Sequence, residues 1–162
     1  MPVDLSATYE KYFPLIREKC RRTLTDRGEA EDVAQETFIR LWQSNLSGED
    51  PRQITAWIYR TSTRLTIDRF RSRQHRDALH GAVIDRRGAA SGAPGNSEAR
   101  QQLERLARQL PKRELEIALL HRVDGLSQPQ IAEVTQISER TIRRLLQKLD
   151  QRLERFRTEA LS

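Results

Sequence analysis

Apolar side chains in the first half of the chain recur at the three- and four-residue spacing of buried helix faces. This spacing predicts one helix over about residues 5–24 and a second over about 29–42, with acidic residues in its first turn. Asp50 directly before Pro51 is typical of a helix start, and no further proline or glycine follows up to about residue 76. The first half is therefore predicted to be three helices, the third being long.

The second half begins with a stretch that loses this periodicity. Residues 77–97 are rich in Gly, Ala, Ser and Pro, which is typical of a flexible linker between domains. Beyond it the apolar spacing predicts two helices, the second ending near Gly125, then a short helix and a longer one capped by Ser138. No strand pattern is present. We therefore expect an all-α protein with two small helical domains, residues 1–76 and 98–162.

The stretch SQPQIAEVTQISERTIRRLLQKL has the pattern of a helix-turn-helix, because a capped short helix, a tight turn and a basic helix follow one another. Ala132 is small enough for close helix packing, and Ile137 can fill the turn. Gln136 stands where glycine usually adopts a left-handed conformation, which costs other residues about 1 kcal/mol, so we expect a slightly altered turn. An ordinary helical hairpin with a solvated basic face is the alternative.

The long third helix carries apolar residues on two opposite sides. One side has Ile54, Trp57, Ile58 and Leu65, and the other has Tyr59, Ile67 and Phe70. We expect that a single core cannot bury both. Arginines interleave with the second side, and aromatic residues among arginines suit unstacked bases and their backbone. The alternative is that Tyr59 and Phe70 pack on the first two helices while the arginines solvate the helix end.

The second helix has an acidic polar face in a basic protein. This face presents Glu29, Asp32, Gln35, Glu36 and Arg40, beside the apolar Phe38 and Trp42. Charge complementarity would keep such a face away from DNA and attract a basic protein surface. It therefore indicates a protein partner, although a solvated face beside two core aromatics is the plainer alternative.

Composition narrows the class of protein. The net charge of +6 and the isoelectric point near 10.1 favour a polyanionic partner. The sequence has neither an apolar run of membrane-spanning length nor the layout of a signal peptide, so we expect a cytoplasmic protein without membrane insertion. Cys20 fits the first helix's apolar face as a reduced core residue. Because His75, His80 and His121 are scattered and no phosphate-binding glycine loop occurs, we expect no catalytic, metal or cofactor site.

Four phrases of the chain, taken in order, resemble the extracytoplasmic-function (ECF) sigma factors of bacterial RNA polymerase. They are YFPLIR, EAEDVAQETFIRLW, ITAWIYRTSTRLTIDRFRSR and LPKRELEIALLHRVDGLSQPQIAEVTQIS. The resemblance implies a non-enzymatic initiation subunit whose first domain docks on core polymerase and opens the minus-ten element, and whose second domain reads the minus-thirty-five element. It implies as partners the clamp coiled coil of the largest polymerase subunit, the polymerase flap, promoter DNA and an anti-sigma protein. The linker would thread toward the active-site channel.

Site residues follow from the same resemblance, position by position. Core polymerase would contact Asp32, Gln35, Glu36, Phe38, Ile39, Leu41 and Trp42. The minus-ten element would contact Trp57, Tyr59, Arg60, Arg64, Asp68, Arg69, Arg71, Arg73 and Arg76. The minus-thirty-five element would contact Ser138, Arg140, Thr141, Arg143, Arg144, Gln147 and Lys148. Thr61, Ser62 and Arg64 depart from the family pattern, which has an apolar residue, alanine and asparagine there. The alternative function is a helix-turn-helix regulator that binds an operator without polymerase.

Overall fold

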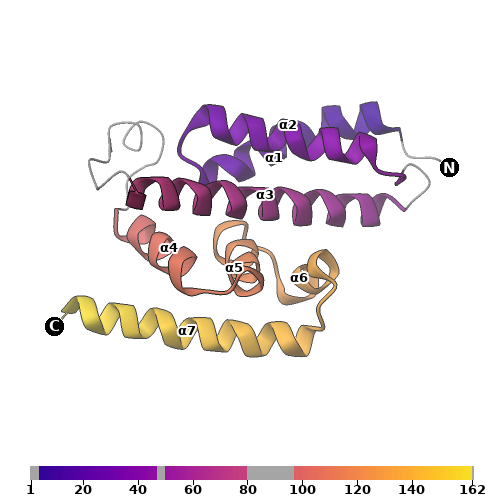
Figure 1. The fold of residues 1–162 in the computed structure, drawn as a ribbon. Coiled ribbons are helices and arrows are strands. Elements are labelled where there is room, and N and C mark those ends of the chain that lie inside the picture. The colour runs from indigo at the N-terminus through magenta and orange to yellow at the C-terminus, as the bar shows by residue number, and fades with distance from the viewer. Residues whose placement is uncertain (1–3, 47–49, 80–96, 162) are drawn as a thin grey trace. The chain divides into compact units, whose positions relative to one another are not determined.

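The computed structural model describes residues 4–46, 50–79 and 97–161, and every regular element among them is a helix (Figure 1). Residue contacts divide the chain into two compact units, Met1–Pro94 and Gly95–Ser162. The prediction of an all-α protein with two helical domains is therefore confirmed.

The predicted linker lies outside the described residues except at its two ends. There the helices are longer than the sequence pattern suggested, because α3 continues to Leu79 and α4 already begins at Ser97. Ala78 and Leu79 are good helix formers, so the loss of apolar periodicity after residue 76 did not mark the helix end.

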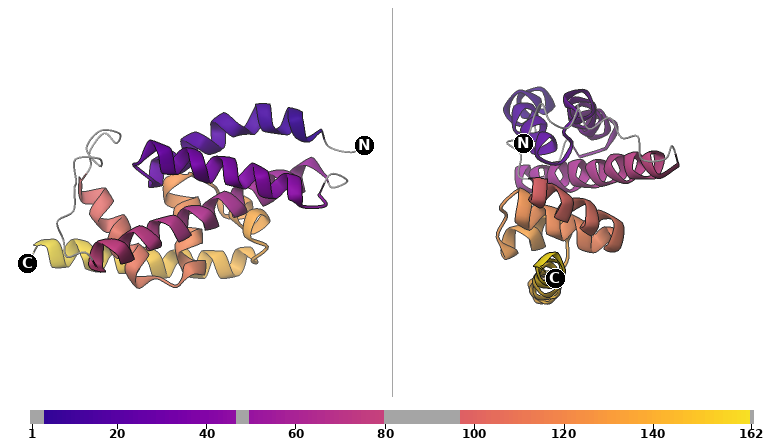
Figure 2. Two further views of the ribbon diagram at one scale, coloured as in Figure 1. Left: turned by 45° about the horizontal axis from the view of Figure 1, so that its top comes forward. Right: turned by 90° about the vertical axis from the view of Figure 1, so that its left-hand side faces the viewer.

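The described residues of the first unit form a bundle of three helices. They are α1 (Leu5–Thr23), α2 (Arg27–Gln43) and α3 (Pro51–Leu79). Each pair of helices is in contact, and the end-on view shows α1 and α2 side by side over α3 (Figure 2). An aspartate precedes each helix, and its carboxylate accepts backbone N–H groups of the first turn: Asp4 from Ser6 at 2.9 Å, Asp26 from Gly28 at 2.8 Å and Asp50 from Arg52 at 3.0 Å. Such caps are each worth about 1 kcal/mol.

The core of this unit buries both sides of α3, so the expectation that one core could not do so was wrong. Ile54 and Ile58 from one side and Ile67 and Phe70 from the other are all buried. Positions four residues apart shift by about 40° around a helix, so a stripe with that spacing winds from one side to the other. The stripe consists of Ile54, Ile58, Ser62, Thr66 and Phe70, all buried. Its small hydroxyl residues bridge the two apolar sides.

Cys20 is a free, buried thiol in this core, as predicted. The hydroxyl of Thr66 lies 3.8 Å from its sulfur, so α1 and α3 meet here through small polar groups. Nearby, the buried Lys19 donates a hydrogen bond of 2.6 Å to the Thr63 hydroxyl, a second polar link between the same two helices. The ammonium of Lys19 is thus buried between α1 and α3.

The second unit contains four α-helices and one π-helical turn among its described residues. They are α4 (Ser97–Gln109), α5 (Lys112–Ala118), η1 (Leu119–Val123), α6 (Gln128–Thr135) and α7 (Glu139–Leu161). Gly125 follows η1 with a φ of 69°, so the predicted stop at this glycine is confirmed. Helix α7 packs on α5 and α6. Further along α7, the Arg105 guanidinium of α4 stacks 4.2 Å from the centroid of Phe156 and pairs with Glu159 at 2.8 Å.

Across the described ranges, no helix combines the length and the hydropathy that a membrane span requires.

Candidate functional site

The outward face of α2 brings together five residues of the predicted polymerase-binding set. They form a single stripe, here called the α2 stripe, of Asp32, Gln35, Glu36, Ile39 and Trp42. Ile39 and Trp42 are 42% and 50% exposed, which is unusual for such large apolar side chains. The stripe therefore combines two carboxylates with an exposed apolar end.

Two residues of the predicted set lie on the opposite side of the same helix. Phe38 and Leu41 are fully buried, so a partner cannot reach them. Phe38 instead meets the ring of Tyr9 at a centroid distance of 5.2 Å, and Tyr9 also lies 5.7 Å from the ring of Trp42. These aromatic contacts hold Trp42 from beneath. Tyr9 lies on α1, and the spacing of residues along the sequence did not show that it supports the exposed tryptophan.

Helix α3 divides the predicted minus-ten residues between different sides. One side carries the α3 strip, formed by Trp57, Arg60, Arg64, Asp68 and Arg71 at spacings of three and four residues. Arg64 and Asp68 are exposed and the other three are partly exposed. Because residues at these spacings are neighbours on a helix surface, the strip is one continuous, net basic surface.

The aromatic residues of α3 that we expected to meet bases lie elsewhere. Phe70 is buried in the bundle, so it cannot stack on a base and its packing matches the alternative considered above. Tyr59 is partly buried on the side of α1, where the Lys19 ammonium lies 5.9 Å from its ring centroid. Trp57 is thus the one aromatic residue of the predicted set that lies in the α3 strip.

The remaining arginines of the set form a second line on α3, here called the arginine edge. It consists of Arg69, Arg73 and Arg76. Arg69 is exposed, whereas Arg73 and Arg76 approach the carboxylate of Glu29 on α2 at 3.6 and 3.8 Å. Two arginines assigned to DNA are therefore already paired with an acid of the neighbouring helix.

The helix-turn-helix of the second unit has the predicted caps and an unaltered turn. Ser127 and Gln130 form a reciprocal capping box, with hydrogen bonds of 2.9 and 3.3 Å. Gln136 itself takes the left-handed conformation, with φ 64° and ψ 26°, so the expected change in the turn was wrong. Its backbone N–H donates to the Ala132 carbonyl at 2.9 Å, and its side-chain amide donates to that of Glu133 at 3.3 Å. The turn therefore keeps the usual left-handed geometry, and Gln136 bears the conformational cost of adopting it.

Helix α7 presents the predicted groove residues on its outer side. Ser138 caps the helix by accepting the Thr141 N–H at 3.3 Å. The exposed polar surface, here called the α7 surface, consists of Arg140, Arg143, Arg144 and Gln147. It lies opposite the buried Ile142 and Leu146. Lys148 points to the flank, where its ammonium is 3.4 Å from the Glu114 carboxylate of α5, so it braces the domain.

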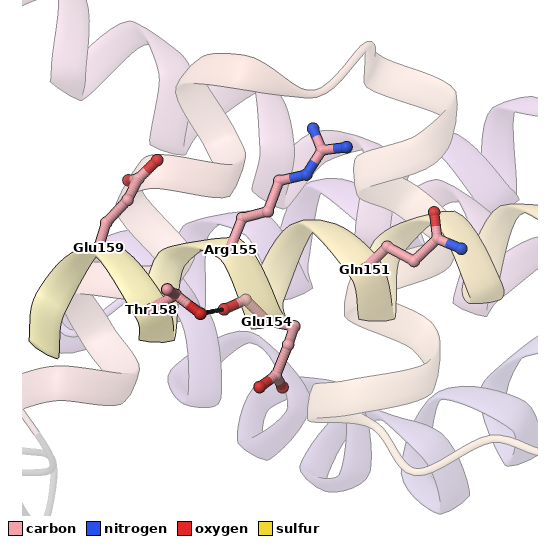
Figure 3. A pocket seen from close by; sticks show the side chains of 5 residues that line it. All are labelled: Gln151, Glu154, Arg155, Thr158 and Glu159. Atoms are coloured by element: carbon pink, nitrogen blue, oxygen red, sulfur yellow. Dashed lines mark hydrogen bonds between the residues drawn. The ribbon is translucent and has the colours of Figure 1, made fainter.

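A broad, open hollow lies along the last turns of α7, where Arg155, Gln151 and Glu159 extend to one side and Glu154 to the other (Figure 3). The hydroxyl of Thr158 is bound to the Glu154 carbonyl at 3.0 Å. Within the described ranges, no group of three His, Cys, Asp or Glu residues could hold a metal ion. The candidate functional surfaces are the α2 stripe, the α3 strip, the arginine edge and the α7 surface.

Each unit matches a known protein family. Residues 8–76 match Sigma-70 region 2, and residues 100–149 match Sigma-70, region 4. The ECF RNA polymerase sigma factor SigW of Bacillus subtilis is 31% identical over 82% of this chain and 77% of its own length. The ferric citrate uptake sigma factor FecI of Escherichia coli is 30% identical over 97% of this chain and 92% of its own length.

A third relative is longer than this chain. It is the probable RNA polymerase sigma factor RfaY of Xanthomonas campestris, which is 31% identical over 94% of this chain. The match covers 43% of RfaY, so the chain spans less than half of that relative. The two family matches follow one another in the order of the two structural units, and SigW and FecI align with most of both. The chain belongs to the extracytoplasmic-function sigma factors of RNA polymerase.

Proposed function

We propose that this chain binds core RNA polymerase, directs it to specific promoters and initiates transcription there. The observation that carries this proposal is that one chain joins an acidic, partly apolar helix stripe to a helix-turn-helix with an outward arginine surface. We assign residues 1–76 to core polymerase and the minus-ten element, residues 98–162 to the minus-thirty-five element, and residues 77–97 to the linker between them.

The α2 stripe is the proposed contact with the clamp coiled coil of the largest polymerase subunit. Its carboxylates suit a basic partner, and Trp42 offers a large apolar side chain of the kind that dominates binding energy at protein interfaces. Tyr9 holds Trp42 in place before binding, so little side-chain entropy is lost on docking. Phe38 and Leu41 support the stripe from inside the bundle and make no direct contact.

The α3 strip is the proposed surface for the opened minus-ten element. Its arginines can hold backbone phosphates, and Trp57 can stack on an unpaired base. Stacking is worth about 1–3 kcal/mol per base, and unpairing a base costs a similar few kcal/mol. Because the two nearly balance, we propose that stable opening needs polymerase to hold the strands apart.

The α7 surface is the proposed reader of the minus-thirty-five element. A recognition helix enters the major groove, where Arg143 and Arg144 can reach guanine edges or phosphates. The buried Ile142 and Leu146 fix the rotation of the helix, so that these arginines face outward. The polymerase flap and an anti-sigma protein are further partners that the family resemblance implies.

Transcription with purified core polymerase tests the proposal. The assay compares core polymerase alone with core polymerase plus the wild-type chain, on genomic DNA of the organism that encodes the chain. New promoter-specific transcripts are expected only when the chain is present. A regulator independent of polymerase would instead bind a specific duplex by itself and produce no new transcripts with core polymerase. That second result would refute the proposed function.

A further inference from the structure

We propose that Glu29 occupies the place of a DNA phosphate between Arg73 and Arg76, and that promoter DNA must displace it to engage these two arginines. Glu29 would then act as a built-in competitor of the promoter at the arginine edge. This inference rests on the proposed function, because it assigns a regulatory step to the same DNA-binding helix.

The geometry places one carboxylate between two guanidinium groups from another helix. Oε2 of Glu29 lies 3.6 Å from Nη1 of Arg73, and Oε1 lies 3.8 Å from Nη2 of Arg76. The Glu29 side chain is 19% exposed, whereas those of Arg73 and Arg76 are 36% and 61% exposed. The arginines are thus reachable from solvent while the acid lies largely beneath them.

The contacts are attractive but loose. Hydrogen bonds between guanidinium and carboxylate groups are usually about 2.7–2.9 Å long, so both distances exceed that range. Oε2 of Glu29 is buried and accepts no hydrogen bond within the described part of the chain. Charge attraction therefore holds the pair without the directional bonds that would resist exchange. A phosphate can offer the same guanidinium groups two well-aligned oxygens.

The position of Glu29 in α2 lowers the cost of releasing the arginines. It lies in the first turn of the helix, and its own N–H donates to the capping carboxylate of Asp26 at 3.2 Å. The partial positive charge of a helix N-terminus favours an acidic side chain there. The Glu29 carboxylate consequently keeps a favourable environment after Arg73 and Arg76 move to phosphates.

The substitution Glu29→Gln tests the inference in the full chain bound to core polymerase. Its affinity for a pre-melted promoter is measured over a series of salt concentrations. We expect binding to become about three- to tenfold tighter at low salt, because two weak ion pairs no longer compete with DNA. We also expect the slope of log affinity against log salt concentration to steepen by up to about one counterion. The reason is that DNA binding to this variant frees no carboxylate.

Glu31→Gln provides the matched control. Glu31 is an exposed acid of the same helix, and it makes no ion pair within the described residues, so the variant changes the net charge equally. It should leave promoter affinity within about twofold of wild type. In a chain that already carries Arg73→Ala and Arg76→Ala, adding Glu29→Gln should give no gain, because nothing remains to be released.

Glu29→Asp gives an independent reading should the glutamine variant fold poorly. It keeps the charge and the helix start but withdraws the carboxylate from the arginines, so an intermediate gain in affinity is expected. Equal affinity of wild type, Glu29→Gln and Glu29→Asp would overturn the inference, as would an equal gain in Glu31→Gln. If wild-type chain forms no transcribing complex, the proposed function itself fails. A transcribing wild type with an unchanged glutamine variant removes only the role of Glu29.

Discussion

Replacing Trp42 with alanine should weaken binding to core polymerase about a hundredfold. Half of this side chain is exposed in the free protein. An aromatic side chain of this kind buries up to about 250 Å² in total, so docking could cover roughly 125 Å² more. At about 25 cal/mol per Å², that area corresponds to about 3 kcal/mol, or roughly a hundredfold in the dissociation constant. Fluorescence anisotropy of labelled chain titrated with core polymerase measures the change.

Leu15→Ala is the matched control for this prediction. Leu15 is 54% exposed, but it lies on α1, outside the α2 stripe. The variant truncates an apolar side chain whose exposed fraction is similar to that of Trp42. The affinity for core polymerase should nevertheless change less than twofold. Circular dichroism should show that both variants keep their helices, since neither side chain is buried in the bundle. If folded Trp42→Ala binds core polymerase as tightly as wild type does, the α2 stripe is not the docking surface.

Three further predictions concern the DNA surfaces and the turn. Alanine at both Arg143 and Arg144 should weaken binding to the upstream promoter element by about 1–3 kcal/mol for each base that the arginines read. The binding should also depend less steeply on salt, and unchanged electrophoretic shifts would contradict the α7 assignment. Alanine at both Arg64 and Arg71 should reduce the permanganate reactivity of promoter thymines while core binding persists, whereas full opening would exclude the α3 strip. Gln136→Val should lower the free energy of unfolding by about 1–2 kcal/mol relative to Gln136→Gly in urea melts, because a β-branched residue resists the left-handed conformation; equal stability would disprove the stored cost.

Local signals in the sequence predicted the helix starts well. Asp50, Ser127 and Ser138 each bind backbone N–H groups within three residues, so their capping depends only on near neighbours along the chain. Gln136 shows the limit of such local reasoning. The conformational preference of a residue other than glycine argued against a left-handed turn here. Packing of the flanking helices outweighs this conformational cost of about 1 kcal/mol.

The apolar pattern could not predict how α3 is buried, because small polar residues complete the buried stripe. Ser62 and Thr66 are buried, yet their hydroxyl groups made them look like surface positions. The Ser62 hydroxyl bonds the Tyr59 carbonyl at 3.1 Å, which satisfies it inside the core. A pattern built only from large apolar residues therefore split one winding stripe into two opposite faces.

Assignment of single site residues needed the tertiary structure. The resemblance carried over whole stretches, and a stretch of helix necessarily includes inward residues such as Phe38 beside outward ones such as Trp42. The pairing of Glu29 with Arg73 joins residues far apart in sequence on two successive helices, and no local spacing predicts it. The resemblance therefore proposed which helices carry the contacts, while packing decided which of their side chains are accessible to a partner.

Arg105 of α4 holds the far end of α7, so a movement of α4 would be transmitted along this long helix to its first turns. Helix α7 has 23 residues, which at 1.5 Å per residue makes a rod about 34 Å long. Its first turns carry Arg140 and Arg143, and its far end is clamped to α4 through Phe156 and Glu159. A tilt of about 5° applied at the clamp would displace the opposite end by about 3 Å, enough to break a hydrogen bond to a base. If the α7 surface reads promoter DNA as proposed, the clamp between α4 and α7 would thus help to set the position of that surface on the DNA.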